Sequence, residues 1–204
     1  MKIRNLTLYV LLACAFCLGR SGGAEDPAAL KLVKAARAYV GLGVAYDGSY
    51  RVIIYPAGDP GGGVGACTDL VVRAYRAIGL DLQVLVHEDM VKEFDAYPAR
   101  RLYEQTRPDT NIDHRRCPNL MAFFKRHAKS LTTSLEPDHL TEWRAGDIVI
   151  FDLLDNGIPS HIGIVSDQTA PSGRPLIIHH FPPLPTEDDS LARWKIVGHF
   201  RYFP

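Results

Sequence analysis

The sequence lacks an excess of charge of either sign, since its 204 residues include 23 Lys and Arg and 23 Asp and Glu. A chain without net charge has no general attraction to nucleic-acid phosphates or to an acidic membrane surface. We therefore expect no nucleic-acid partner. Internal repeats and low-complexity segments are also absent. Hydrophobic residues make up 47% of the chain, which at this length suits one globular domain with a substantial core.

The N-terminal apolar run is too short to span a bilayer. It covers residues 6–18, whereas a membrane-spanning helix needs ~20 apolar residues. Lys2 and Arg4 precede the run, and small residues follow it at Gly22 and Ala24. A short basic start, an apolar centre and a small-residue cleavage site are typical of a secretory signal peptide.

Cleavage after Ala24 would remove residues 1–24 and leave a single domain at 25–204. We therefore expect an exported protein, periplasmic or secreted, with no integral membrane segment after cleavage. Two alternatives stay open: an uncleaved membrane anchor, and lipoprotein processing at Cys14. The shortness of the apolar run disfavours the first, and Leu12 fits a lipoprotein signal poorly.

Cysteine is scarce, because the chain has four and the predicted signal peptide contains two of them, Cys14 and Cys17. In an oxidising compartment, the remaining Cys67 and Cys117 are candidates for a structural disulfide. The sequence around Cys67 favours a free, reactive thiol instead. A structural disulfide does not require a glycine-rich loop that runs into a helix start, whereas a nucleophile benefits from one.

Cys67 follows the glycine-rich residues 61–66 and opens a predicted helix at 68–78. A thiol at a helix N-terminus faces unpaired backbone N–H groups and the positive end of the helix dipole, and both favour the thiolate. The glycines would let a substrate backbone come close. This setting indicates a nucleophilic cysteine.

The remaining pattern predicts helices in the first part of the mature chain and strands in the last part. A helix at 28–40 is capped by Asp26 and Pro27. The other expected helices cover 82–94 and 118–129, a short β-rich stretch covers 50–55, and strands cover 147–152, 161–165, 176–179 and 194–203. This order predicts an α+β domain with an antiparallel sheet.

Two histidines lie on neighbouring predicted strands, His161 at the head of one and His179 at the end of the next. A turn centred on residue 170 would place them directly opposite each other, on one face of the sheet. A register slip of one residue would put them on opposite faces, and His180 would then be the better partner of His161.

A cysteine and a histidine brought together with a third polar group form the arrangement of a thiol hydrolase. Cys67 would attack as thiolate, His161 would act as general base and acid, and His179 would orient the imidazole. Backbone N–H groups beside Cys67 would hold the oxyanion. A metal site formed by His161, His179 and His180 is disfavoured, because adjacent strand residues point to opposite faces, and we expect no cofactor.

The arginine-rich segment at 107–116 has two interpretations. It forms either a loop held by surface ion pairs or a rim that binds acidic groups through its guanidinium groups. The candidate substrate-binding residues are Gly65, Asp69, Arg115, Arg116 and His180.

Four segments resemble the NlpC-like cell-wall peptidases. Residues 66–75 resemble the Asp-Cys-Ser-Gly-Leu-Val helix start of that clan, 143–151 its Pro-Gly-Asp-Leu-Val-Phe-Phe strand, and 161–165 its His-Val-Gly-Ile-Tyr strand. Residues 177–179 resemble the following strand, which bears the third polar residue. The resemblance implies a trimmed papain-like fold, in which the helix that bears the nucleophile packs on the C-terminal sheet. It also implies hydrolysis of peptide or amide bonds in peptidoglycan stem peptides by Cys67, His161 and His179.

Within that clan, the chain resembles more closely an exported bacterial family labelled a domain of unknown function, number 1287. Residues 67–69, 86–90, 108–116 and 198–202 carry this similarity. Thr68-Asp69 replaces the Ser-Gly of the clan, and Cys117 stands where an aliphatic residue is expected. Two alternatives to a peptidase or amidase stay open: a catalytically silent module that binds cell-wall peptides, and an acyl transferase that uses the same thioester chemistry.

Overall fold

The computed structural model describes residues 26–61 and 63–203. The predicted signal peptide at 1–24, with its alternative lipoprotein site at Cys14, lies outside the described residues. In the described part of the chain, no helix is both long enough and apolar enough to cross a membrane.

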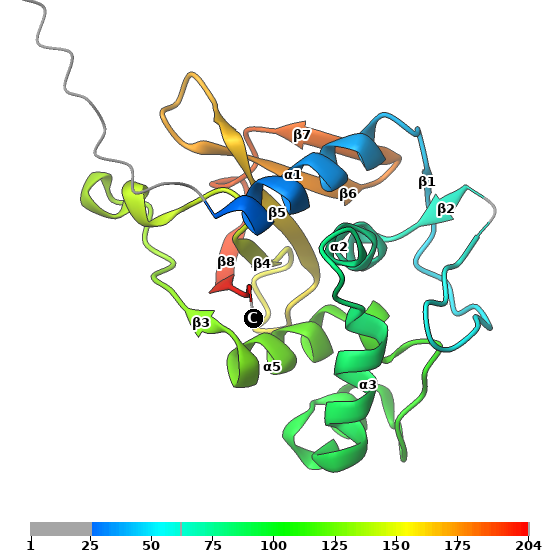
Figure 1. Ribbon diagram of the computed structural model, residues 1–204. Helices are drawn as coiled ribbons and strands as arrows, with labels where there is room; N and C mark the ends of the chain where they lie inside the picture. Colours follow the sequence, from blue (N-terminus) through cyan, green and yellow to red (C-terminus); the bar gives the residue numbers. More distant parts are fainter. Residues whose placement is uncertain (1–25, 62, 204) are drawn as a thin grey trace, which may run out of the picture.

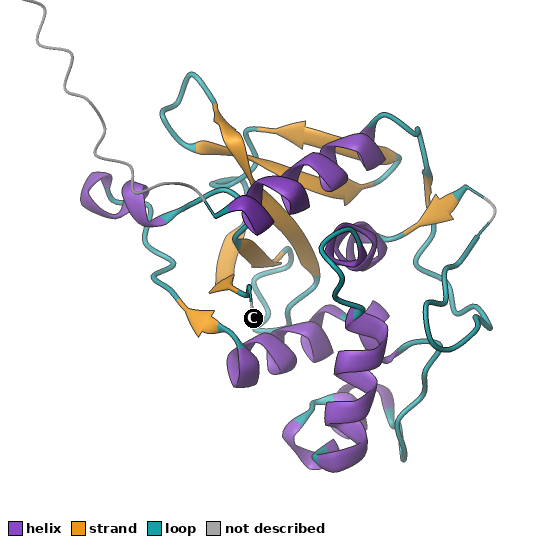
Figure 2. Cartoon of the chain, in the orientation of Figure 1, coloured by secondary structure: helices purple, strands orange, loops and turns teal. Residues whose placement is uncertain are grey.

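The described chain forms a six-stranded antiparallel sheet with its main helices gathered on one side (Figures 1 and 2). The strand order is β3-β8-β4-β5-β6-β7. The α-helices are α1 (Pro27–Val40), α2 (Cys67–Arg76), α3 (Leu82–Lys92), α4 (Ala99–Tyr103) and α5 (Cys117–His127). The strands of the sheet are β3 (Lys129–Ser130), β4 (Ile148–Asp152), β5 (His161–Thr169), β6 (Pro175–Phe181), β7 (Leu184–Asp188) and β8 (Lys195–Arg201). The predicted α+β class with an antiparallel sheet is confirmed.

Helices α1 and α2 lie side by side across β5 and β6 (Figure 1). The Asp26 side chain caps α1 by accepting a hydrogen bond from the N–H of Ala28 at 2.8 Å. Within the helix, the side chains of Leu32 and Val33 are fully buried. Strand β4 is buried along its whole length. Its alternate residues face two separate apolar clusters, one under the helices and one on the other face of the sheet.

Three local expectations were wrong. Residues 50–55 form no strand, and Val52 and Ile54 are 85% and 74% exposed. The strand pairing in this region is instead a short parallel bridge between β1 (Ala45–Tyr46) and β2 (Val64–Gly65). Helix α4 and strand β7 were not predicted either.

The register between β5 and β6 differs from the expected one by two residues. His179 lies opposite Gly163 rather than His161, because Thr169 pairs with Pro175 and the turn is thus centred on residue 172 instead of 170. The irregularity of the ladder between Val165 and Thr169 then reduces the offset to two residues. A shift of two residues keeps every side chain on its original face. His161 and His179 therefore share a face as diagonal neighbours.

Candidate active site

Cys67 is the first residue of α2, directly after the short strand β2. The Asp69 carboxylate fixes this helix start, because its Oδ2 accepts the backbone N–H of Ala66 at 2.6 Å. Gly65 is needed at the preceding position, since a Cβ atom there would lie 2.6 Å from the hydroxyl oxygen of Tyr39. The local sequence therefore places the thiol at the positive end of a helix.

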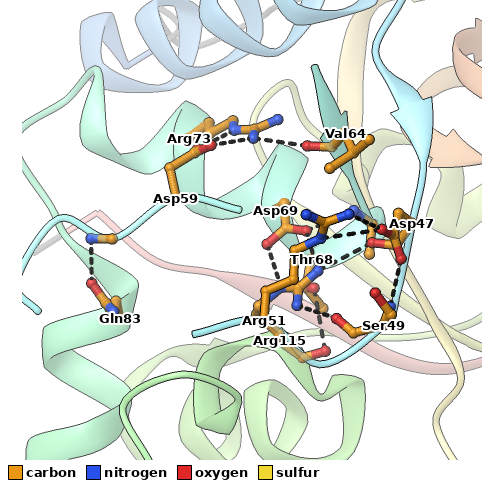
Figure 3. Close-up of polar contacts among 12 residues, drawn as sticks. Asp47, Ser49, Arg51, Asp59, Val64, Thr68, Asp69, Arg73, Gln83 and Arg115 are labelled. Atoms are coloured by element: carbon orange, nitrogen blue, oxygen red, sulfur yellow. Dashed lines mark hydrogen bonds and ion pairs between the residues drawn. The ribbon is translucent and has the colours of Figure 1, made fainter. Parts of the chain in front are cut away.

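A buried ion pair between Arg115 and Asp69 also fixes the start of α2 (Figure 3). The Arg115 guanidinium donates to both carboxylate oxygens of Asp69, at 2.9 and 3.0 Å. It also donates to the carbonyl oxygens of Ser49 and Asp47, at 2.7 and 3.1 Å. Burial raises the pKa of Asp69, while Arg115 acts in the opposite direction.

The predicted substrate-binding role of Asp69 and Arg115 is therefore not what this geometry supports. Both side chains are buried and directed at each other and at the backbone, so neither stands on a rim that could bind acidic groups. Arg116 is partly buried, and its guanidinium carbon lies 3.8 Å from the centre of the Tyr103 ring. Asp69 and Arg115 hold the framework of the site.

Four groups surround the Cys67 sulfur. The Cys117 Sγ lies 3.7 Å away, and both thiols are free. Besides Cys117, His161 and the backbone of Ile162 act on the sulfur by lowering the pKa of Cys67, and burial together with the nearby Cys67 sulfur raises the pKa of Tyr46. The predicted pairing of Cys67 with His161 is thus present in space, although the two residues are far apart in the sequence.

These contacts shift the pKa values of the two thiols in opposite directions. The hydrogen bond from Cys117 lowers the pKa of Cys67 well below its usual value, burial opposes this, and His161 and the Ile162 N–H lower it further. The hydrogen bond to Cys67 raises the pKa of Cys117, as does burial. Cys67 is therefore the more acidic thiol of the pair, and Cys117 the less acidic one.

A line of hydrogen bonds leads from His161 away from the sulfur. His161 Nε2 lies 2.7 Å from His179 Nδ1. His179 Nε2 in turn lies 3.3 Å from Asp188 Oδ1 and 3.4 Å from the Ser190 hydroxyl. The hydroxyl of Thr186 donates to the other Asp188 oxygen at 3.0 Å. The hydrogen bond with His179 keeps the pKa of Asp188 well below its usual value.

This line fixes the position of each imidazole proton. An ionised Asp188 can only accept, so His179 Nε2 must carry a proton and His179 Nδ1 must be the acceptor. His161 Nε2–H then donates to His179, and His161 Nδ1 is left to face the sulfur. Burial lowers the pKa of His179, which keeps its ring neutral as this arrangement requires.

Aromatic rings enclose the two histidines. The Trp194 ring lies 5.5 Å from that of His161 and 5.8 Å from that of His179, and Phe181 lies 5.6 Å from His161. The rings limit the freedom of both imidazoles and shield their hydrogen bond from water, which strengthens it.

His180 points to the other side of β6 and does not join the line of hydrogen bonds. Its Nδ1 lies 3.2 Å from the Tyr39 hydroxyl, and its ring packs edge-on against Tyr46 at 5.1 Å. Burial lowers its pKa to about 4, so the ring is neutral at physiological pH. The His180 ring therefore packs against Tyr46. His179, and not His180, is the residue that contacts His161.

A groove of about 360 Å³ lies between α4, α5 and the loop that joins β4 to β5, and none of Cys67, His161 and His179 lines it. Its walls include Leu102, Met121 and Ile158, and basic side chains stand around it at Arg101, Lys125 and Arg126. Two of its other lining residues, Pro118 and Pro159, are close in sequence to Cys117 and His161.

Sequence reasoning missed Tyr46, Asp188 and Trp194. Tyr46 stands on a two-residue strand too short to show a pattern, and Asp188 ends the unpredicted strand β7. Trp194 precedes β8; it is the first residue of the strand predicted at 194–203 and one of two tryptophans in the chain, which is the signal that could have identified it. Among the described residues, no group of three or more His, Cys, Asp or Glu side chains could hold a metal ion.

Comparison with known proteins places the chain among sequences of one family. The family model described as a domain of unknown function, DUF1287, matches residues 33–202. An Escherichia coli (strain K12) protein described as uncharacterized protein YijF is 47% identical over 174 residues, which cover 85% of this chain and 82% of that protein. No solved structure matches the chain.

Proposed function

The chain belongs to the DUF1287 family, and we propose that it is a thiol hydrolase with a papain-like arrangement, related to the NlpC-like peptidases. The observation that carries the proposal is the hydrogen-bonded series His161–His179–Asp188, together with the lowering of the Cys67 pKa by Cys117 and His161. A nucleophile activated by a base, which is oriented by a third group, is the signature of covalent catalysis at a carbonyl carbon.

In the first half of the reaction, the Cys67 sulfur attacks the carbonyl carbon of a peptide or amide bond. The carbonyl oxygen becomes an oxyanion, for which backbone N–H groups at the start of α2 and the Tyr46 hydroxyl are the available donors. Removing one such donor typically costs ~3 kcal/mol of transition-state stabilisation. His161 then gives its Nδ1 proton to the departing amine, which leaves an acyl thioester on Cys67.

In the second half, water attacks the thioester carbon. His161 Nδ1 takes the proton of the water, and the Cys67 sulfur departs as thiolate. Throughout, His161 Nε2–H stays hydrogen-bonded to His179. The same arrangement thus serves both the neutral and the protonated imidazole, so no side chain has to rotate between the two steps.

Peptidoglycan stem peptides are the substrates that we propose. Support comes from the similarity of residues 66–75, 143–151 and 161–165 to the corresponding segments of the NlpC-like cell-wall peptidases, and from the predicted export signal at 1–24. The groove between α4 and α5 has apolar and basic lining residues that suit a peptide with apolar and acidic parts.

Incubation with purified sacculi, followed by mass spectrometry of the released fragments, tests the proposal. The wild-type protein should release peptide fragments, and Cys67→Ala should release none while its circular dichroism spectrum stays unchanged. Equal release by both proteins would refute the assignment. Equal binding of sacculi without any turnover would instead favour the silent binding module, and transfer of an acyl group to an added amine would favour a transferase.

A further inference from the structure

Cys67 and Cys117 are the two cysteines of the described chain, and the fold brings them together from positions that are far apart in the sequence. Their sulfur atoms are 3.7 Å apart and both side chains are buried. This separation is van der Waals contact, longer than the ~2.05 Å of a disulfide bond but close enough for side-chain rotation to join the sulfurs.

Each cysteine is also the first residue of a helix, Cys67 of α2 and Cys117 of α5. Two helix N-termini therefore point their positive ends at one pair of sulfurs, which stabilises negative charge there. The line from His161 to Asp188 reaches Cys67 without Cys117. The Cys117 thiol therefore takes part in no step of the reaction proposed above.

We propose that Cys67 and Cys117 form a redox site, in which a small peroxide oxidises the nucleophile and Cys117 resolves the product to a reversible disulfide. This inference holds whether or not the protein is a hydrolase. A bare thiolate at Cys67 is open to stepwise oxidation, and beyond the sulfenic acid these steps are essentially irreversible. A neighbouring thiol would stop oxidation at a state that a reductant can reverse.

The chemistry balances in two steps. The Cys67 thiolate attacks one oxygen of hydrogen peroxide, so that an S–O bond forms, the O–O bond breaks, and hydroxide leaves and takes up a proton to become water. The Cys117 sulfur then attacks the Cys67 sulfenic acid, so that the S–S bond forms, the S–O bond breaks, and hydroxide leaves with the Cys117 proton as a second water. Two thiols are oxidised and one peroxide is reduced.

Peptide mapping after peroxide treatment tests this proposal without any substrate. The folded protein is treated with hydrogen peroxide, denatured in acid, alkylated with N-ethylmaleimide, and digested with trypsin without reductant. Cleavage after arginine and lysine places Cys67 in the peptide 52–73 and Cys117 in the peptide 117–125, separate from Cys14 and Cys17. We expect these two peptides to be joined, and dithiothreitol to separate them with both thiols restored.

Cys117→Val is the matched control, because it keeps an apolar side chain of similar volume and removes only the second sulfur. In this variant, Cys67 should pass to sulfinic and sulfonic acid, which dithiothreitol does not reverse. If circular dichroism shows that the valine variant is unfolded, Cys117→Ser takes its place. The proposal fails if wild-type Cys67 is over-oxidised as fast as in the variant while Cys117 remains free to be alkylated.

Discussion

At the scale of single residues, the ionisation of one sulfur atom depends on contacts within a few ångströms. Burial of Cys67 disfavours a charged sulfur, whereas hydrogen bonds from Cys117, His161 and Ile162 stabilise it. The hydrogen bonds prevail, and the pKa of Cys67 is lowered. Cys117 is equally enclosed but donates its proton to Cys67 instead of accepting one, so its pKa is raised. The same burial thus gives one thiolate and one neutral thiol.

His161→Gln should raise the pKa of the Cys67 thiol, because both a hydrogen bond and a neighbouring positive charge are lost. The rate of iodoacetamide alkylation of Cys67, followed by peptide mass spectrometry, reports the thiolate fraction at each pH. In the wild type the rate should reach half its maximum well below the ordinary thiol pKa of ~8.5, and in the variant at a higher pH. Any hydrolysis should fall by about 10²–10⁴-fold.

His139→Gln is the control for this experiment, since His139 pairs with Glu142 on an exposed surface turn. Its alkylation profile should match that of the wild type. Superimposable profiles of the wild type and His161→Gln would show that the imidazole does not govern the sulfur.

Asp188→Leu should disturb the proton arrangement of both histidines, because His179 Nε2 loses the acceptor that holds its proton. Asp188→Asn should preserve the arrangement, since the amide oxygen still accepts although the charge is gone. Nitrogen-15 NMR spectra of histidine-labelled protein separate protonated from unprotonated ring nitrogens. We expect one tautomer of His179 in the wild type and in Asp188→Asn, and a mixture in Asp188→Leu.

A purely structural role for Asp188 predicts a different outcome. In that case Asp188→Leu would unfold the chain or change nothing, and the His179 signals of the folded protein would stay those of a single tautomer. Comparison with His179→Gln identifies which signals belong to His179.

At the scale of secondary structure, the sequence predicted the elements that have a clear period and missed those that do not. The helices at α1, α2, α3 and α5 and the strands at β4, β5, β6 and β8 were expected within a few residues of their ends. The segment at 50–55 has the composition of a strand but no partner, because the backbone N–H of Ile53 bonds the Asn111 side chain instead. Composition reports the preference of a segment and cannot report whether a partner strand is present.

The approach of β5 to β6 depends on a glycine. Gly163 lies directly opposite His179, and a Cβ atom there would lie 2.6 Å from Ile177 Cγ2 and 3.1 Å from His179 Cβ. The absence of a side chain therefore allows the two strands to place His161 and His179 in contact. Sequence reasoning chose the correct face for His179 because an error of two residues in register preserves the face.

Gly163→Ala should therefore push β6 away and weaken the contact between His161 and His179. We expect a lower melting temperature, and alkylation of Cys67 that is half-maximal at a higher pH than in the wild type. Gly41→Ala is the matched control, because its added Cβ atom meets its nearest neighbour at an ordinary 3.5 Å. If both variants melt and react alike, close packing at Gly163 does not position the histidines.

At the scale of the whole molecule, the candidate site is assembled from almost the full length of the described chain. Tyr46 comes from β1, Cys67 from α2, Cys117 from α5, and the histidines from the sheet. The Arg115–Asp69 pair connects three of these regions at once, since Arg115 also donates to the carbonyl groups of residues 47 and 49 (Figure 3). Such long-range ties are invisible in local sequence patterns, which explains why Asp69 and Arg115 were predicted to bind substrate.

Arg115→Met should destabilise the whole fold and loosen the start of α2. The change leaves the Asp69 carboxylate buried without its partner, and breaking a buried pair in this way costs about 3–5 kcal/mol. Urea unfolding measures the loss. Arg100→Met is the control, because Arg100 pairs with Asp95 on the exposed surface, where such a pair contributes about 0–1 kcal/mol. The double variant Asp69→Asn/Arg115→Met should recover part of the loss, since it removes the stranded charge. Equal unfolding free energies for Arg115→Met and Arg100→Met would show that the buried pair does not hold the site together.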